Sequence, residues 1–150
     1  MFMGQFSHSL DEKGRLIIPS KYREELGREF IVARGYDTCL YAYSNSEWNR
    51  FAEEIENLPE TSLRNRQKRR FFLSTATNLE MDKQGRVLIP SYLRDPAKIS
   101  GDVVIAGVGK KLEIWSREIW DSVTNSDEMA AIANEQYDSG EGENRPETVV

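Results

Sequence analysis

Several residue types are scarce in this 150-residue chain, and each scarcity excludes a class of protein. The single cysteine, Cys39, rules out an internal disulfide and fits a reducing compartment. The single histidine, His8, lies on the apolar face of an alternating segment, where we expect it to fill the core or the sheet edge. No apolar run approaches the length of a membrane span, and the N-terminus does not resemble a signal peptide. We therefore expect a cytoplasmic protein with no membrane partner.

Catalytic motifs are missing as well. The sequence contains no P-loop, no Gly-x-Ser-x-Gly motif and no metal-ligand cluster, and neither His8 nor Cys39 has a plausible catalytic partner. Only Asp11 and Asp82 occur in a repeated glycine-flanked setting, and each is followed by an arginine that keeps it ionised. We therefore expect no enzyme activity, no cofactor, no metal and no small-molecule substrate. We expect Cys39 to be an inert buried thiol.

The net charge of −5 comes from the C-terminal end of the chain. Residues 127–150 hold seven of the 25 acidic residues and one of the 20 basic ones, which leaves 18 acids and 19 bases in residues 1–126. Within this nearly neutral body, residues 62–70 (SLRNRQKRR) contain five cations and no acid. A compact basic patch attracts phosphate even when the whole chain is acidic. The charge therefore does not exclude a nucleic-acid partner.

One unusual phrase occurs twice in the sequence. Residues 11–23 read DEKGRLIIPSKYR, and residues 82–94 read DKQGRVLIPSYLR. Seven positions of the two copies are identical at an offset of 71 residues. In the first copy they are Asp11, Gly14, Arg15, Ile18, Pro19, Ser20 and Arg23, and in the second they are, in the same order, Asp82, Gly85, Arg86, Ile89, Pro90, Ser91 and Arg94. After one extra residue in the second copy, residues 31–48 align with residues 103–120. The shared order of these matches indicates a tandem repeat.

Each copy is expected to form strand, turn, strand, helix, strand, turn and strand. In the first copy the expected strands are QFSHSL, RLIIP, EFIVARG and CLYAYS. The first helix, SKYREEL, lies between Pro19 and Gly27. A second helix begins at Ser44, buries an apolar face that includes Trp48, and ends at Pro59. A copy of about 45 residues, made mostly of short strands, cannot bury a large core alone. We therefore expect the two copies to complete each other's barrel.

The segment 63–81 joins the two copies and carries the basic patch. An apolar stripe of helical period runs from Phe71 to Leu79. The candidate phosphate contacts Arg66, Arg69 and Arg70 project from roughly the opposite side of this helix. Subunit packing or solubility is the alternative role for this basic face.

The repeated phrase, the N-terminal MFMG and the stretch RNRQKRRFFLSTATNLEMD resemble the MraZ family, bacterial regulators of the AbrB/SpoVT/MazE-like group linked to the division and cell-wall gene cluster. The resemblance implies an α+β, mainly β, swapped-hairpin fold, in which two AbrB-like units form a pseudo-dimeric double-split β-barrel with flanking helices. It also implies a ring-shaped homo-oligomer that binds short repeats in double-stranded promoter DNA and represses its own operon at the nucleoid. The corresponding segments are a first SpoVT-AbrB-like repeat at 5–48, a helical connector at 49–76, a second repeat at 77–120, and an acidic tail at 121–150 that we expect to be disordered.

Under this resemblance the two arginine turns are the expected DNA-binding sites. Arg15 and Arg86 each start a strand at the rim of a unit, where a guanidinium can donate two hydrogen bonds to guanine O6 and N7. Lys13 and Lys83 are expected to contact phosphate, which adds affinity without sequence specificity. Gln84 occupies in the second copy the position of Lys13, so we expect the first copy to make the tighter contact.

The other turn residues are expected to hold these arginines in place. Asp11 and Asp82 lie across the turns and can accept hydrogen bonds from turn amides or from the guanidinium. Gly14 and Gly85 are free to adopt positive φ.

Two alternatives to a DNA-binding site stay open. The repeated turn can be a folding device alone, in which an Asp–Arg ion pair stabilises a hairpin. Arg23 and Arg94 are expected to make structural or inter-unit contacts rather than to read bases.

An antitoxin-like protein-interaction module with the same fold is the second alternative, because the acidic tail offers a surface for a basic partner protein.

Overall fold

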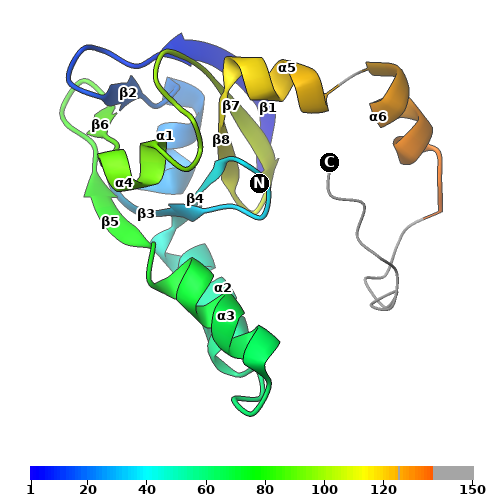
Figure 1. Ribbon diagram of the computed structural model, residues 1–150. Coiled ribbons are helices and arrows are strands. Elements are labelled where there is room, and N and C mark those ends of the chain that lie inside the picture. Colours follow the sequence, from blue (N-terminus) through cyan, green and yellow to red (C-terminus); the bar gives the residue numbers. More distant parts are fainter. Residues whose placement is uncertain (125, 137–150) are drawn as a thin grey trace.

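The computed structural model describes residues 1–124 and 126–136 (Figure 1). The strands are β1 (Phe2–Ser9), β2 (Arg15–Ile17), β3 (Glu29–Arg34), β4 (Leu40–Ser44), β5 (Thr77–Glu80), β6 (Arg86–Leu88), β7 (Asp102–Gly109) and β8 (Leu112–Ser116). The helices are α1 (Ser20–Leu26), α2 (Asn45–Glu56), α3 (Leu63–Leu73), α4 (Ser91–Arg94), α5 (Arg117–Val123) and α6 (Ser126–Ala133). The fold is therefore mixed α and β with mainly antiparallel strands, as predicted. Within the described ranges, no helix combines the length and the hydrophobicity needed to span a bilayer.

The strands form one large sheet and one small ribbon. The large sheet has six strands in the order β1-β7-β8-β4-β3-β5, and β2 pairs with β6 in a separate two-stranded ribbon. All of these pairs are antiparallel. The barrel expected from the sequence is not closed by the described strands, because β1 and β5 lie at opposite edges of an open sheet with four strands between them.

The pairing of the sheet crosses between the two repeats. Strand β1 of the first repeat pairs with β7 of the second, so that Phe6 faces Ile105. Strand β5 of the second repeat pairs with β3 of the first, so that Phe30 faces Leu79. Strands β4 and β8 join the two halves at the centre of the sheet. The strand order is therefore unchanged when the two repeats are exchanged.

The two faces of the six-stranded sheet bury different apolar clusters. In β4, Leu40 and Ala42 contribute to the larger cluster, whereas Tyr41 and Tyr43 contribute to the smaller one. This alternation follows from the period of two in a β-strand, which points successive side chains to opposite faces.

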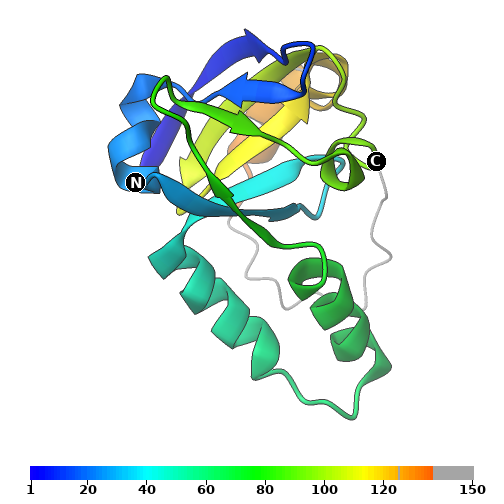
Figure 2. The same ribbon diagram turned by 90° about the vertical axis from the view of Figure 1, so that its left-hand side faces the viewer.

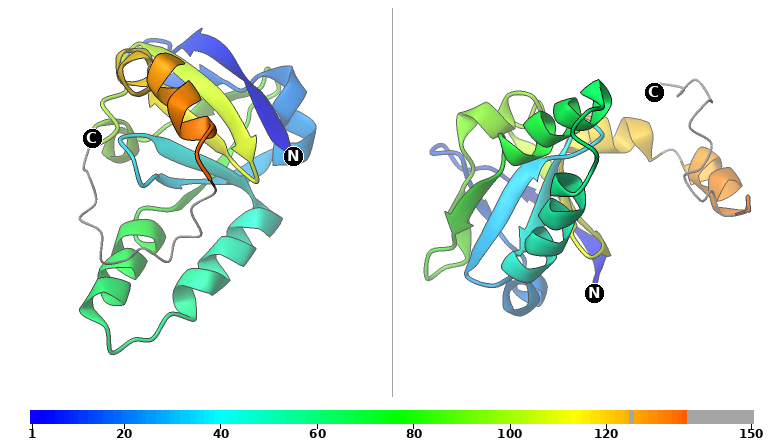
Figure 3. Two further views of the ribbon diagram at one scale, coloured as in Figure 1. Left: turned by 90° about the vertical axis from the view of Figure 1, so that its right-hand side faces the viewer. Right: turned by 90° about the horizontal axis from the view of Figure 1, so that it is seen from below.

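Each cluster also shows which elements cover its face of the sheet. The larger cluster includes Leu16 of β2 and Val87 of β6, so the ribbon lies over one face. The smaller cluster includes Ile55 of α2 and Phe72 of α3, so this helical hairpin covers the other face. Figures 2 and 3 show the same arrangement, with the α2–α3 hairpin projecting from the sheet away from β2 and β6. The basic helix and the ribbon therefore lie on opposite sides of the molecule.

The helix boundaries agree with the sequence in the first repeat and differ in the connector. Helix α1 lies between Pro19 and Gly27 as predicted. The Ser44 hydroxyl accepts a hydrogen bond from the Glu47 N–H at 3.3 Å and caps α2. The helical stripe predicted to reach Leu79 is wrong in its second half, because α3 ends at Leu73. Leu79 instead lies in β5, where pairing with β3 overrides the local helical period.

The scarce residues lie where the sequence indicated. Cys39 is buried, and burial raises the pKa of its thiol, which keeps it protonated. His8 is half-buried on the edge strand β1. Trp48 and Trp120 are partly buried against the smaller cluster. Disorder was expected for the whole acidic tail at 121–150, but the part of it that the structure describes contains the end of α5 and helix α6. Residues 125 and 137–150 lie outside the described residues.

Candidate nucleic-acid interface

The β2–β6 ribbon presents one buried and one exposed face. Its central residues Leu16 and Val87 pair with each other and are buried. Side chains alternate along a strand, so the flanking positions face outward. These outward residues are Arg15, Ile17, Arg86 and Leu88. The exposure of the two aliphatic residues was not predicted from the sequence, although alternation around the central residue carried the signal for it.

Each repeat contributes one strand of the ribbon, and each strand is fastened to the turn of the other repeat. Ile18 N–H donates to the carbonyl of Gly85 at 2.9 Å, and Ile89 N–H donates to the carbonyl of Gly14 at 3.1 Å. Gly14 and Gly85 have φ values of 80° and 81°, in the region that favours glycine. The two turns are therefore parts of one structure and cannot move independently.

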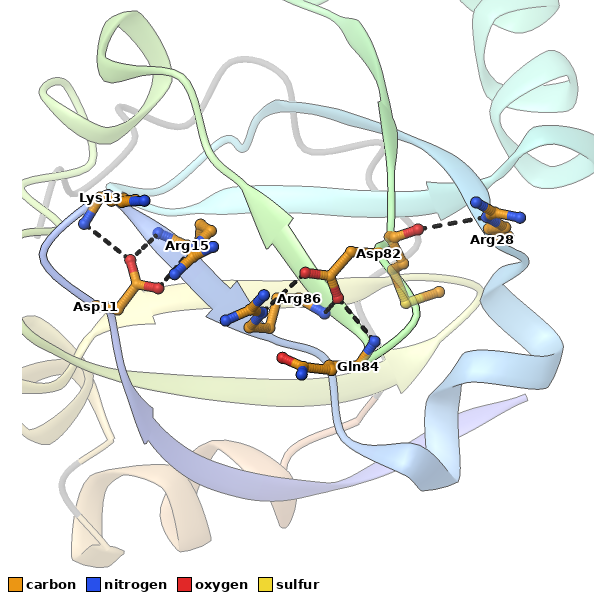
Figure 4. Close-up of polar contacts among 8 residues, drawn as sticks. Asp11, Lys13, Arg15, Arg28, Asp82, Gln84 and Arg86 are labelled. Carbon is orange, nitrogen blue, oxygen red and sulfur yellow. Dashed lines mark hydrogen bonds and ion pairs between the residues drawn. The ribbon is translucent and has the colours of Figure 1, made fainter.

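Asp11 organises the first turn through both of its carboxylate oxygens. Oδ1 accepts hydrogen bonds from the backbone N–H groups of Lys13 and Arg15, each at 2.9 Å. Oδ2 accepts a hydrogen bond from Arg15 Nε at 2.6 Å (Figure 4). The Arg15 N–H is the main cause that lowers the pKa of Asp11, and the Arg15 guanidinium and the Lys13 N–H lower it further, against an opposing effect of burial. The carboxylate is therefore ionised and holds the arginine at its Nε side.

Asp82 repeats this arrangement in the second turn. Its Oδ1 accepts hydrogen bonds from the N–H groups of Gln84 and Arg86, each at 2.9 Å, and its Oδ2 accepts from Arg86 Nε at 2.8 Å. The Arg86 N–H is the main cause that lowers the pKa of Asp82. Figure 4 shows the two Asp–Arg pairs next to each other, one on each strand of the ribbon.

The side-on contact leaves the outer edge of each guanidinium available. Within the described residues, Nη1 and Nη2 of Arg15 and of Arg86 make no hydrogen bond, and each side chain is 30% exposed. A guanidinium held at Nε presents its two terminal nitrogens as a fixed fork, the shape that matches two acceptors in one plane. Guanine O6 and N7 offer this pair of acceptors in the major groove.

Two lysines flank the arginines at the tips of the turns. Lys13 and Lys83 are exposed, and neither ammonium group has a hydrogen-bond or ion-pair partner in the part of the chain that the structure describes. Gln84 takes the position equivalent to Lys13, so the two turns carry their cations at different places. The structure thus brings together the ribbon, both arginines, both aspartates and both lysines.

Arg23 and Arg94 lie behind the turns rather than on the outward face of the ribbon. Arg23 Nε donates to the Ile18 carbonyl at 2.7 Å, and Arg94 Nε donates to the Ile89 carbonyl at 2.8 Å. Each guanidinium lies against the turn glycine of the other repeat. The predicted structural contact between repeats is confirmed for both arginines.

The basic helix α3 is separated from this surface. Arg66 Nη1 donates to the Glu60 carbonyl at 2.9 Å, and Arg69 Nη2 donates to the carbonyls of Glu56, at 3.0 Å, and of Leu58. Arg70 Nη1 donates to the Gln67 side chain at 2.8 Å. The first two arginines therefore hold the loop between α2 and α3, on the face of the sheet opposite to the ribbon (Figure 1).

Comparison with known proteins places the chain among a large set of similar sequences. The family model described as "MraZ protein, putative antitoxin-like" matches residues 1–71 and again residues 72–139, in agreement with the two-copy repeat. A "Transcriptional regulator MraZ" from Caldanaerobacter subterraneus is 48% identical over 130 residues, covering 87% of this chain and 91% of the relative. A protein of the same name from Lachnoclostridium phytofermentans is 46% identical over 140 residues, covering 93% and 98%. Another from Natranaerobius thermophilus is 52% identical over 122 residues, covering 81% and 85%.

Proposed function

This chain belongs to the MraZ family of transcriptional regulators, and from this premise we propose that it binds double-stranded DNA by inserting the β2–β6 ribbon into the major groove. The protein is not an enzyme. The observation that carries the proposal is the pair of outward arginines, Arg15 and Arg86. Each is held at Nε by its own aspartate, and no described residue hydrogen-bonds to Nη1 or Nη2. The major groove of B-DNA is wide enough for a two-stranded β-ribbon.

Sequence is read by the forked ends of the two arginines. Each bidentate arginine–guanine contact contributes roughly 1–3 kcal/mol of discrimination against another base. The aspartates lower the cost of binding, because a side chain that is already ordered loses less conformational entropy in the complex. Lys13 and Lys83 contact phosphates and set the position of the ribbon without reading sequence. Arg15 makes the stronger contact because Lys13 lies beside it in the first turn, whereas Gln84 takes that place in the second.

The finer features of the fold and assembly are part of the same proposal. The crossed pairing of β1 with β7 and of β5 with β3 supports a swapped-hairpin arrangement of two AbrB-like units, at 5–48 and 77–120. We infer a ring-shaped homo-oligomer that represses its own division and cell-wall operon at the nucleoid, and the support for this step is the family resemblance. A single ribbon offers few base contacts, and a ring that presents many copies binds repeated sites through effective concentration.

Fluorescence anisotropy with a labelled duplex from upstream of the gene tests this function. Wild type and Arg15→Ala are each titrated against this duplex and a scrambled one at several salt concentrations. Arg50→Ala is a matched control, because Arg50 also forms an ion pair with a carboxylate, Glu47, at 3.0 Å but lies on α2. The expected result is a preference for the native duplex that Arg15→Ala loses and Arg50→Ala retains.

Two results would contradict the proposal. Equal binding of wild type to both duplexes would show that the ribbon reads no bases. Absence of binding, together with recovery of one stoichiometric partner protein, would favour the protein-interaction alternative instead.

A further inference from the structure

The outward face of the ribbon is not uniformly basic. Ile17 is 41% exposed and Leu88 is 55% exposed, although both are large aliphatic residues. They occupy equivalent positions in the two repeats, at the same offset of 71 residues as the arginines. Each repeat therefore places an exposed aliphatic side chain two residues after its outward arginine.

The strand register brings these side chains next to the arginines of the opposite strand. Arg15 pairs with Leu88, and Ile17 pairs with Arg86. Directly paired residues of an antiparallel ribbon have their Cβ atoms about 4.5–5.5 Å apart. The outward face is therefore an array of two guanidinium groups on one diagonal and two aliphatic groups on the other. A ribbon that reached DNA only through charge would have no use for exposed aliphatic side chains on its outward face.

We propose that Ile17 and Leu88 contact the 5-methyl groups of thymines that neighbour the guanines read by Arg86 and Arg15, an inference that rests on the proposed function. In the major groove the thymine methyl is the one apolar feature of the base edges, and an aliphatic side chain distinguishes it from cytosine. The surrounding cations, Arg15, Arg86, Lys13 and Lys83, make DNA the partner whose charge complements this surface. The ribbon thus reads two kinds of base, guanine by hydrogen bonds and thymine by apolar contact.

Replacing thymine by deoxyuridine in the native duplex removes only the methyl groups and tests this proposal directly. Wild type is expected to bind the deoxyuridine duplex about threefold to fivefold more weakly for each methyl group that it contacts. Ile17→Ala and Leu88→Ala are expected to reduce this difference, and the double variant to remove it. Ile17→Val retains a branched side chain and is expected to keep the difference.

Val108→Ala is the matched control, because Val108 is 45% exposed but lies on β7 in the six-stranded sheet. This variant is expected to show the same difference in affinity between the thymine and the deoxyuridine duplex as wild type. Equal binding of both duplexes by wild type, with its preference over a scrambled duplex intact, would overturn the thymine contact and leave the proposed function standing. A wild type with no preference for the native duplex would overturn both. A deoxyuridine effect that persists unchanged in the double variant would also overturn the proposal, because the methyl groups would then act through the shape of the DNA.

Discussion

The guanidinium of Arg23 occupies the space that a side chain on Gly85 would need. A Cβ atom built on Gly85 would lie 2.2 Å from Arg23 Cζ, and the same atom on Gly14 would lie 3.1 Å from Arg94 Cζ. Each contact joins the helix that follows one strand of the ribbon to the turn that precedes the other strand. The glycine of each turn is therefore fixed both by its positive φ and by an arginine of the opposite repeat.

We predict that Gly85→Ala destabilises the protein more than Gly14→Ala. Alanine in the left-handed region costs roughly 1–2 kcal/mol at either position. At Gly85 the new methyl group must also displace Arg23 from the Ile18 carbonyl, which costs about 0.5–1.5 kcal/mol more. Urea denaturation of the two variants measures the difference in the free energy of unfolding.

Gly101→Ala is the control for these substitutions, because a Cβ atom there meets nothing within 4 Å and its φ is not positive. It is expected to change stability by no more than about 0.5 kcal/mol. When Arg23 is already replaced by alanine, Gly85→Ala is expected to lower the free energy of unfolding only by the cost of placing alanine in the left-handed region. Additive effects of Arg23→Ala and Gly85→Ala would show that the two residues do not interact.

The sequence predicted the geometry of the two Asp–Arg turns better than it predicted the contacts around them. The duplicated Asp-x-x-Gly-Arg pattern identified both turns, because an aspartate and an arginine four residues apart meet across a tight turn. The partners of Arg23 and Arg94 could not be assigned, because a repeat does not reveal which copy of a turn a side chain reaches. The role of Arg69 was also beyond the sequence, since its acceptors are carbonyls at the end of α2 and in the loop after it, more than ten residues away.

The ionised aspartates of the turns predict a pH dependence of stability. The folded-state pKa values of Asp11 and Asp82 lie below the ordinary value of 3.8, so the stabilisation they provide is present above that pH and is lost as the pH falls through the folded values. The variant with both Asp11→Asn and Asp82→Asn is therefore expected to lose less stability than wild type between pH 5 and pH 3. Denaturation curves across this range test the prediction.

Asp121→Asn serves as the control for the pH series. Asp121 is 62% exposed and forms one ion pair with Arg117 at 3.5 Å, without organising a turn. Its variant is expected to follow the wild-type pH dependence. A double aspartate variant that also followed it would show that the two turns contribute nothing to acid sensitivity.

The difference between the two turn tips predicts a change in the salt dependence of DNA binding. Lys13→Gln makes the first turn resemble the second, and Gln84→Lys does the reverse. Loss of one phosphate contact is expected to reduce the magnitude of the negative slope of log K against log salt by about 1. It is also expected to weaken binding to the native and the scrambled duplex equally. Gln84→Lys is expected to increase the magnitude of this slope by a similar amount. A change in sequence preference with an unchanged slope would instead assign Lys13 to base reading.

The partly buried Arg69 of helix α3 predicts a loss of stability rather than of DNA binding. Arg69 donates through Nη2 to the carbonyls of Glu56 and Leu58, and its removal leaves both carbonyls without this charged donor. Since hydrogen bonds to charged groups contribute about 1.5–3 kcal/mol, Arg69→Ala is expected to lower the free energy of unfolding by this amount. Arg70→Ala is the control, because Arg70 is exposed and, among the described residues, its side chain bonds only to Gln67. Both variants are expected to keep the wild-type salt slope with the native duplex, because α3 lies on the side of the sheet opposite to the ribbon. A less steep salt dependence of DNA binding, with unchanged stability, in Arg69→Ala would show that α3 contacts the DNA.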